Sequence, residues 1–135
     1  MVLKILIAED YKDLADSYKM ALEERGHLVI TTRDGIECLQ TYGDYVKQGI
    51  EGEKPYFDLV ILDQNMPGMD GIDVAKEIQK INLKQRIIFI TGYGDSLIKK
   101  LRQLNETVEV MNKPFTVDAL LAEVEDGQYP NYVKC

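Results

Sequence analysis

The chain has no tryptophan, a single histidine and only two cysteines among its 135 residues. With one histidine, His27, no Cys-His or Ser-His-Asp catalytic set can be assembled, and we expect this residue at the surface. The two cysteines, Cys38 and Cys135, are far apart and indicate neither a disulfide framework nor a metal-binding motif. We therefore expect both to be reduced thiols.

Positive charge is also scarce, since 16 Lys and Arg residues stand against 23 Asp and Glu residues, for a formal net charge of −7. Binding to nucleic acid phosphates needs clustered Lys and Arg, so direct nucleic acid binding is not expected. No apolar run approaches the roughly 20 residues that cross a bilayer, and the N-terminal run meets acids too soon to be a signal peptide. These absences favour a cytoplasmic protein without membrane contact.

The residues that are present alternate between apolar runs and segments of helical periodicity. Strands are expected at about residues 3–8, 28–32, 57–62, 86–90 and 107–111. Helices are expected at about 12–25, after the capping residue Asp34, after residue 71, from about residue 95, and from the capping residue Thr116. The alternation predicts a single α/β domain over residues 1–127, a doubly wound five-stranded parallel sheet with five helices. Residues 128–135 are expected to be a tail without regular structure.

Chemically capable side chains follow four of the predicted strands. Glu9 and Asp10 follow the first run, Asp63 ends the third, Thr91 ends the fourth and Lys113 follows the fifth. In an open parallel sheet, ligands bind beyond the carboxyl ends of the strands. Three carboxylates gathered there repel one another and attract a hard cation such as Mg²⁺. A carboxylate beside Mg²⁺ can be a nucleophile towards phosphorus, with the lysine and threonine stabilising the transferring group.

Each of these residues taken alone has an ordinary explanation. Asp63 could be a turn residue, Glu9 and Asp10 could favour the start of a helix, and Lys113 could be a solvated surface lysine. Their occurrence at the same end of four predicted strands is much harder to explain as coincidence. The sequence therefore predicts a site for a divalent cation and a phosphoryl group.

From about residue 3 to residue 125 the chain resembles the receiver domain of bacterial and archaeal two-component response regulators. The resemblance depends on four segments in order, residues 7–10 (IAED), 59–71 (LVILDQNMPGMDG), 90–93 (ITGY) and 112–115 (NKPF). It implies a flavodoxin-like sheet with strand order 2-1-3-4-5. It also implies a cis peptide bond between Lys113 and Pro114.

The resemblance further implies a function and residue roles. Asp63 is expected to accept a phosphoryl group from a sensor histidine kinase or a histidine phosphotransferase, and Thr91 and Lys113 to engage that group. The implied Mg²⁺ ligands are Glu9 (through water), Asp10, Asp63 and the main-chain carbonyl of Asn65. The protein would be a switch that catalyses only its own phosphorylation and dephosphorylation, without an attached output domain. It would act on a downstream protein as a monomer or a phosphorylation-dependent dimer.

Two features depart from the family pattern. Val110 stands three residues before Lys113, where the family often has Tyr or Phe as the partner of the threonine, so the usual aromatic readout is in question. The segment from Lys47 to Tyr56 is long for a connection between the second helix and the third strand. A tolerated surface insertion is favoured there over an extension of the second helix or a partner-specific surface.

Three other functions have to be weighed. An aspartyl-phosphate phosphohydrolase typically needs a second acid two residues after the nucleophile, where this chain has Asn65. A flavodoxin-type module needs a hydroxyl- and glycine-rich phosphate loop after the first strand, where residues 9–13 carry three acids. A degenerate receiver that only binds partners is disfavoured by the intact acids, Thr91 and Lys113. The phosphorylation switch is the leading interpretation.

Overall fold

The computed structural model describes residues 2–46, 55–92, 100–101, 104 and 108–126. One five-stranded parallel sheet runs through it in the order β2-β1-β3-β4-β5. The strands are β1 (Lys4–Ala8), β2 (Leu28–Thr32), β3 (Leu59–Asp63), β4 (Ile87–Thr91) and β5 (Val108–Asn112). The helices are α1 (Lys12–Glu24), α2 (Gly35–Val46), α3 (Gly71–Ile81) and α5 (Val117–Asp126). The predicted fold class and strand order are therefore confirmed.

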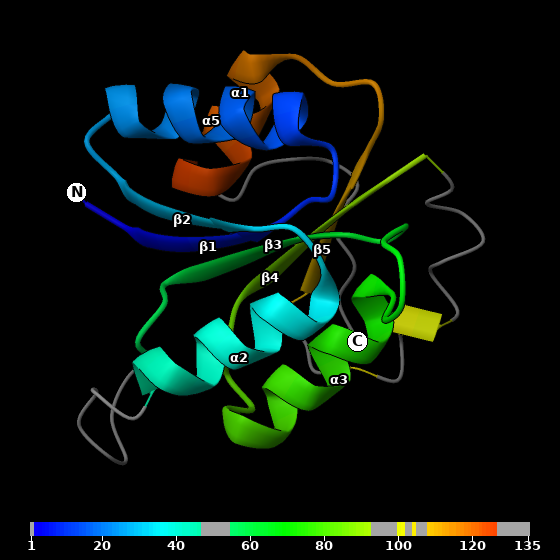
Figure 1. The fold of residues 1–135 in the computed structure, drawn as a ribbon. Coiled ribbons are helices and arrows are strands. Elements are labelled where there is room, and N and C mark those ends of the chain that lie inside the picture. Colours follow the sequence, from blue (N-terminus) through cyan, green and yellow to red (C-terminus); the bar gives the residue numbers. More distant parts are fainter. Residues whose placement is uncertain (1, 47–54, 93–99, 102–103, 105–107, 127–135) are drawn as a thin grey trace.

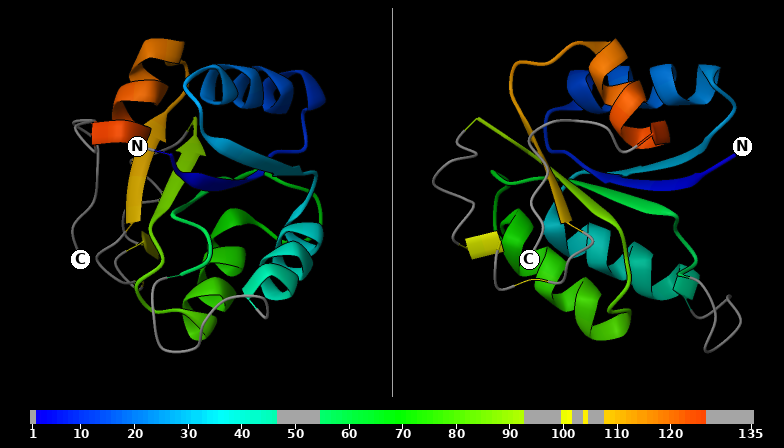
Figure 2. Two further views of the ribbon diagram at one scale, coloured as in Figure 1. Left: turned by 90° about the vertical axis from the view of Figure 1, so that its left-hand side faces the viewer. Right: turned by 180° about the vertical axis from the view of Figure 1, so that it is seen from behind.

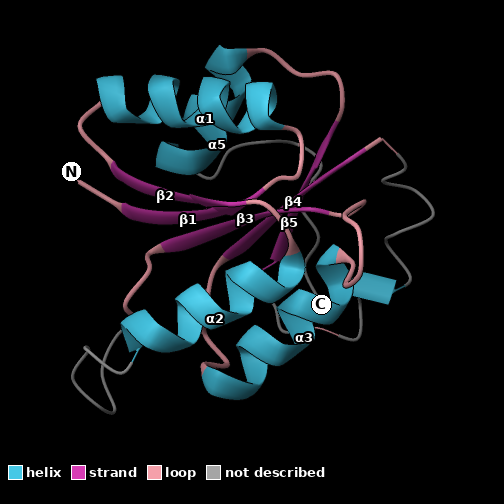
Figure 3. Cartoon of the chain, viewed as in Figure 1, coloured by secondary structure: helices cyan, strands magenta, loops and turns pink. Residues whose placement is uncertain are grey.

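The helices cover both faces of the sheet. Helices α1 and α5 lie on one face and α2 and α3 on the other (Figures 1 and 3). The turned views show α5 packed beside α1 (Figure 2). Within the described ranges, no helix has the length and the apolar character needed to cross a bilayer.

The predicted element boundaries differ from the observed ones by at most two residues. The largest difference is at β3, which was expected from residue 57 and begins at Leu59. The predicted helix from about residue 95 falls mostly outside the described residues, of which 100 and 101 are helical. For that reason four helices rather than five are described. The tail 128–135 and most of the segment from Lys47 to Tyr56 also lie outside the described residues.

The central strands read as continuous apolar runs because both of their faces are covered. Successive side chains of a strand point to opposite faces, so β3 contributes to two cores. Val60 and Leu62 pack in the core beneath α2 and α3, whereas Leu59 and Ile61 pack in the core beneath α1 and α5. The thiol of Cys38 is free and lies in the first of these cores, where burial raises its pKa to about 12.

Side-chain caps hold the helix starts at the edge where the strands end. Asp34 Oδ1 accepts a hydrogen bond from the Glu37 N–H at 2.8 Å, before α2. Thr116 Oγ1 accepts one from the Ala119 N–H at 3.0 Å, before α5. Both caps were predicted from the sequence. They fix the loops that follow β2 and β5, and so fix the edge at which ligands bind in this fold.

The prediction that His27 is a surface residue is wrong, because its side chain is buried and its residue is 3% exposed. Its Nδ1 accepts a hydrogen bond from the Leu3 N–H at 3.1 Å, and its Nε2 lies 3.1 Å from Glu125 Oε2. Since Nδ1 accepts, Nε2 carries the proton of the neutral imidazole and donates to Glu125. His27 thus joins the start of β1 to the end of α5, at the edge opposite the strand ends.

Candidate functional site

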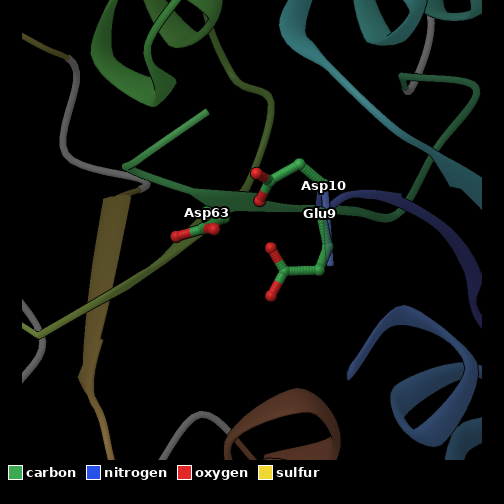
Figure 4. Close-up of side chains that lie close together, drawn as sticks. All are labelled: Glu9, Asp10 and Asp63. Atoms are coloured by element: carbon green, nitrogen blue, oxygen red, sulfur yellow. The ribbon is translucent and has the colours of Figure 1, made fainter. Parts of the chain in front are cut away.

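Three carboxylates meet where β1 and β3, which are neighbours in the sheet, come to an end (Figure 4). Glu9 and Asp10 directly follow β1, and Asp63 is the last residue of β3. One carboxylate oxygen from each residue lies within 4.8 Å of the others. Glu9 and Asp63 are buried at 2% and 5% exposure, and Asp10 is exposed to solvent. The structure therefore brings together the three acids that the sequence singled out.

The lysine and the threonine lie along the same edge. Lys113 follows β5, and its Nζ is 3.5 Å from Asp63 Oδ1 and 3.9 Å from Glu9 Oε1. Thr91 is the last residue of β4, which lies between β3 and β5, and it is 1% exposed. The main-chain N–H of Lys113 donates to the Thr91 carbonyl at 2.8 Å. The peptide bond between Lys113 and Pro114 is cis, as the resemblance implies.

The loop after β3 also contacts the central acid. The main-chain N–H of Asn65 donates to Asp63 Oδ1 at 3.3 Å, so residue 65 lies against the central acid. The loop ends at Asp70, whose Oδ1 accepts from the Asp73 N–H at 3.0 Å and caps α3. All six residues given roles from the sequence are thus placed at one edge of the sheet.

The electrostatics of the site centre on Glu9. The pKa of its carboxyl is raised to about 8, mainly by burial and then by the neighbouring Asp63 and Asp10, against the opposing effect of Lys113. Among the described residues, neither carboxylate oxygen of Glu9 has a hydrogen-bond partner. A hydrogen bond with Asp63 can form only when one of the two carboxyls is protonated. Apart from the Lys113 ammonium, 3.9 Å from Oε1, the described residues therefore offer this buried acid no compensation.

The donor set fits a small, hard cation. Mg²⁺ prefers oxygen ligands, keeps several waters and is usually bound by one or two carboxylates. Among the described residues, three carboxylates stand here against the one ammonium of Lys113, and the exposed Asp10 leaves the site open to water. The Glu9 oxygens, which accept no hydrogen bond from the described residues, supply the observation that an oxygen-ligated cation would explain.

One side chain beside the site was not singled out by the sequence. Gln64 directly follows Asp63, and its Oε1 accepts a hydrogen bond from the Ile72 N–H at 3.1 Å. A glutamine after an acid carries no signal of its own in the sequence. Its partner is eight residues away and is determined by the path of the loop between them, so only the structure could identify it.

Comparisons with known proteins identify the family of the chain. A family model described as the response regulator receiver domain matches residues 5–125. The uncharacterized transcriptional regulatory protein YrkP of Bacillus subtilis is 33% identical over 124 residues, which are 92% of this chain and 48% of that protein. Sporulation initiation phosphotransferase F of Bacillus subtilis is 29% identical over 118 residues, which are 87% of this chain and 86% of that protein.

Among solved structures, the chain is similar to a response regulator receiver domain protein from Clostridium thermocellum. The TM-score is 0.73 at 27% identity, and the match covers 87% of each chain. The present chain spans about half the length of curated relatives such as YrkP. The family match covers both the sheet and the residues at the ends of its strands. The chain therefore belongs to the response regulator receiver domain family of two-component systems.

Proposed function

We propose that this receiver is a Mg²⁺-dependent phosphorylation switch in which Asp63 accepts the phosphoryl group. Receiver domains take phosphoryl groups from histidine kinases or phosphotransferases. The observation that carries the assignment to Asp63 is its position, buried between Glu9, Asp10 and the Lys113 ammonium, which is 3.5 Å from its Oδ1. The other acids flank this centre, and Asp63 alone contacts both the lysine and the loop after β3.

The chemistry is a displacement at phosphorus. A carboxylate oxygen of Asp63 attacks the phosphorus of a phosphohistidine, forming an oxygen–phosphorus bond as the nitrogen–phosphorus bond breaks. The leaving imidazole takes up a proton from solvent. Negative charge spreads over the equatorial oxygens during transfer, and Lys113 is close enough to Asp63 to neutralise part of it. Thr91, at the end of β4, offers a hydroxyl to one of the same oxygens.

Four residues would hold the cation. They are Asp10, Asp63, the main-chain carbonyl of Asn65, and Glu9 acting through water. When bound, Mg²⁺ would neutralise the phosphoryl oxygens and orient them for in-line displacement. The protein contributes the buried acids that require a counter-charge and the lysine whose Nζ lies 3.5 Å from Asp63 Oδ1.

On this proposal the chain catalyses only its own phosphorylation and dephosphorylation. The phosphodonor is a sensor histidine kinase or a histidine phosphotransferase, and the receptor of the signal is a protein that recognises the phosphorylated conformation. A cytoplasmic location stays a prediction, as does the oligomeric state of monomer or phosphorylation-dependent dimer.

Mass spectrometry of the intact protein tests the proposal. Incubation with acetyl phosphate and Mg²⁺ should add the mass of one phosphoryl group, and either EDTA or Asp63→Asn should abolish the gain. Asp58→Asn is the matched control, because Asp58 lies at the opposite end of β3 and accepts a hydrogen bond from the Lys4 N–H. Asp58→Asn should retain the mass gain. An unchanged mass in the wild type, or a gain that survives Asp63→Asn, would contradict the proposal.

A further inference from the structure

The side chain of Gln64 closes the base of the loop between β3 and α3. Its Oε1 accepts a hydrogen bond from the Ile72 N–H at 3.1 Å. Its main-chain carbonyl accepts one from the Gly71 N–H at 3.2 Å, and its own N–H donates to the Ile90 carbonyl of β4 at 3.0 Å. Residue 64 is therefore fixed both to the sheet and to the first turn of α3. The loop of residues 65–70 begins and ends at this one point.

The base of the loop is tightly packed. A Cβ placed on Gly71 would lie 2.9 Å from the carbonyl oxygen of Asp63 and 3.0 Å from Gln64 Oε1. Real Cβ atoms essentially never come closer than 3.0 Å to another heavy atom. Only glycine at position 71 lets the start of α3, the main chain of Asp63 and the amide of Gln64 come this close. The first residue of α3 therefore packs directly against the main chain of Asp63.

Asn65 is the first residue above this base. Its N–H donates to Asp63 Oδ1 at 3.3 Å, and its carbonyl is a ligand in the proposed function. A main-chain carbonyl has no side-chain torsions of its own, so the conformation of the loop decides where it lies. Mg²⁺ demands near-ideal octahedral geometry, which makes its affinity sensitive to such a ligand. Groups that orient metal ligands are worth roughly 10- to 100-fold in affinity.

We propose that Gln64 is a positioning residue for the metal site. The hydrogen bond between its Oε1 and the Ile72 N–H holds the loop so that residue 65 is in place before a cation arrives. This inference depends on the proposed function, because it assumes that the site binds Mg²⁺. Gln64 affects Mg²⁺ binding only through the positions of Asn65 and Asp63. Its side chain has to supply an oxygen that accepts the hydrogen bond from the Ile72 N–H.

Two substitutions separate the acceptor from the bulk of the side chain. Gln64→Met keeps the length and removes the acceptor, whereas Gln64→Glu keeps an acceptor. In titration calorimetry, Gln64→Met should raise the Mg²⁺ dissociation constant about tenfold. Gln64→Glu should bind Mg²⁺ at least as tightly as the wild type. In metal-free protein, amide exchange at Ile72 should be about tenfold faster in Gln64→Met and unchanged in Gln64→Glu.

A control distinguishes positioning from simple stabilisation of α3. Asp70 caps the same helix through a different N–H, that of Asp73. Asp70→Ala weakens the helix start, and Asp70→Asn shows how much of its effect comes from lost charge alone. The difference in Mg²⁺ affinity between Asp70→Ala and Asp70→Asn measures what the cap itself contributes. If that difference equals the effect of Gln64→Met, the proposal is overturned.

The remaining outcomes are also decisive. Wild-type affinity for Mg²⁺ in folded Gln64→Met would refute the role of Gln64 and leave the proposed function intact. A wild-type protein that binds no Mg²⁺ would instead refute the proposed function. Should Gln64→Met not fold, Gln64→Ala removes the same acceptor with less bulk and is read against the same expectations.

Discussion

At the scale of single residues, Glu9 links the site to the stability of the fold. Its pKa is raised from 4.5 to about 8, mainly because burial disfavours the charged form. The folded metal-free protein therefore holds a proton that the unfolded chain releases near its ordinary pKa. The stabilising contribution of this carboxyl is complete below about pH 4.5 and is lost as the pH rises to about 8.

Glu9→Gln should consequently stabilise the metal-free protein at pH 8 by roughly 1 to 3 kcal/mol, and by much less at pH 5. The gain arises because a neutral amide avoids the cost of burying the charge. Urea denaturation in EDTA at the two pH values measures it. Glu24→Gln, at an exposed position of α1, removes the same charge and should change stability by less than about 0.5 kcal/mol. Equal effects of Glu9→Gln at both pH values would show that its charge is not the cause.

At the scale of elements, β5 carries the departure from the family pattern. Val110 is 2% exposed, lies opposite Phe89 in the register of β4 and β5, and belongs to the core beneath α2 and α3. A small side chain therefore fills its place in that core. There is no aromatic ring at this position to move between a buried and an exposed state.

Val110→Tyr tests whether the core keeps space for the ring that many receivers have. Because the position is filled and buried, the larger side chain should overpack the core and lower the free energy of unfolding by roughly 1 to 3 kcal/mol. Denaturant unfolding measures the change, with Val2→Tyr at a position 60% exposed as the control for added bulk. A Val110→Tyr protein as stable as the wild type would show that the space exists.

The elements also show where sequence-based prediction succeeds and where it fails. Asp63 and Thr91 could be placed at strand ends because each closes an apolar run, and runs of that kind define buried parallel strands. His27 could not be placed, since its partner Glu125 is 98 residues away and meets it only when α5 packs on the sheet. The contact of Gln64 was missed for the related reason that a loop path decides it. Local patterns thus predict elements, and contacts between elements need the fold.

At the scale of the whole molecule, α5 runs from the site to the opposite edge of the sheet. Its start follows Lys113 and is capped by Thr116. At its other end, Arg86 donates to the carbonyls of Glu123 at 2.6 Å and Val124 at 2.9 Å, and pairs with Glu109 at 3.1 Å. These carbonyls belong to the last turn of the helix, which has no partners within the helix itself. Arg86 therefore fastens the far end of α5 to β4 and β5.

Arg86→Met should release this end of α5. Loss of the hydrogen bonds to the Glu123 and Val124 carbonyls should cost roughly 1 to 3 kcal/mol of unfolding free energy, and amide exchange should rise in the last turn of α5 before other helices respond. Site-resolved exchange by NMR measures both the location and the size of the effect. Arg33→Met, at an exposed position after β2, is the control for loss of an arginine. Uniform acceleration of exchange throughout the protein would contradict a local fastening role.

The parallel sheet has a further consequence for how this molecule can diversify. All five strands run in the same direction, so their last residues lie at one edge of the sheet. The acids, the threonine and the lysine therefore lie together along this rim. The stretch between Val46 and Pro55 connects the end of α2 to the approach to β3, and both anchors lie on the side away from that rim. A change of length in this connection therefore falls far from the residues that would carry the reaction.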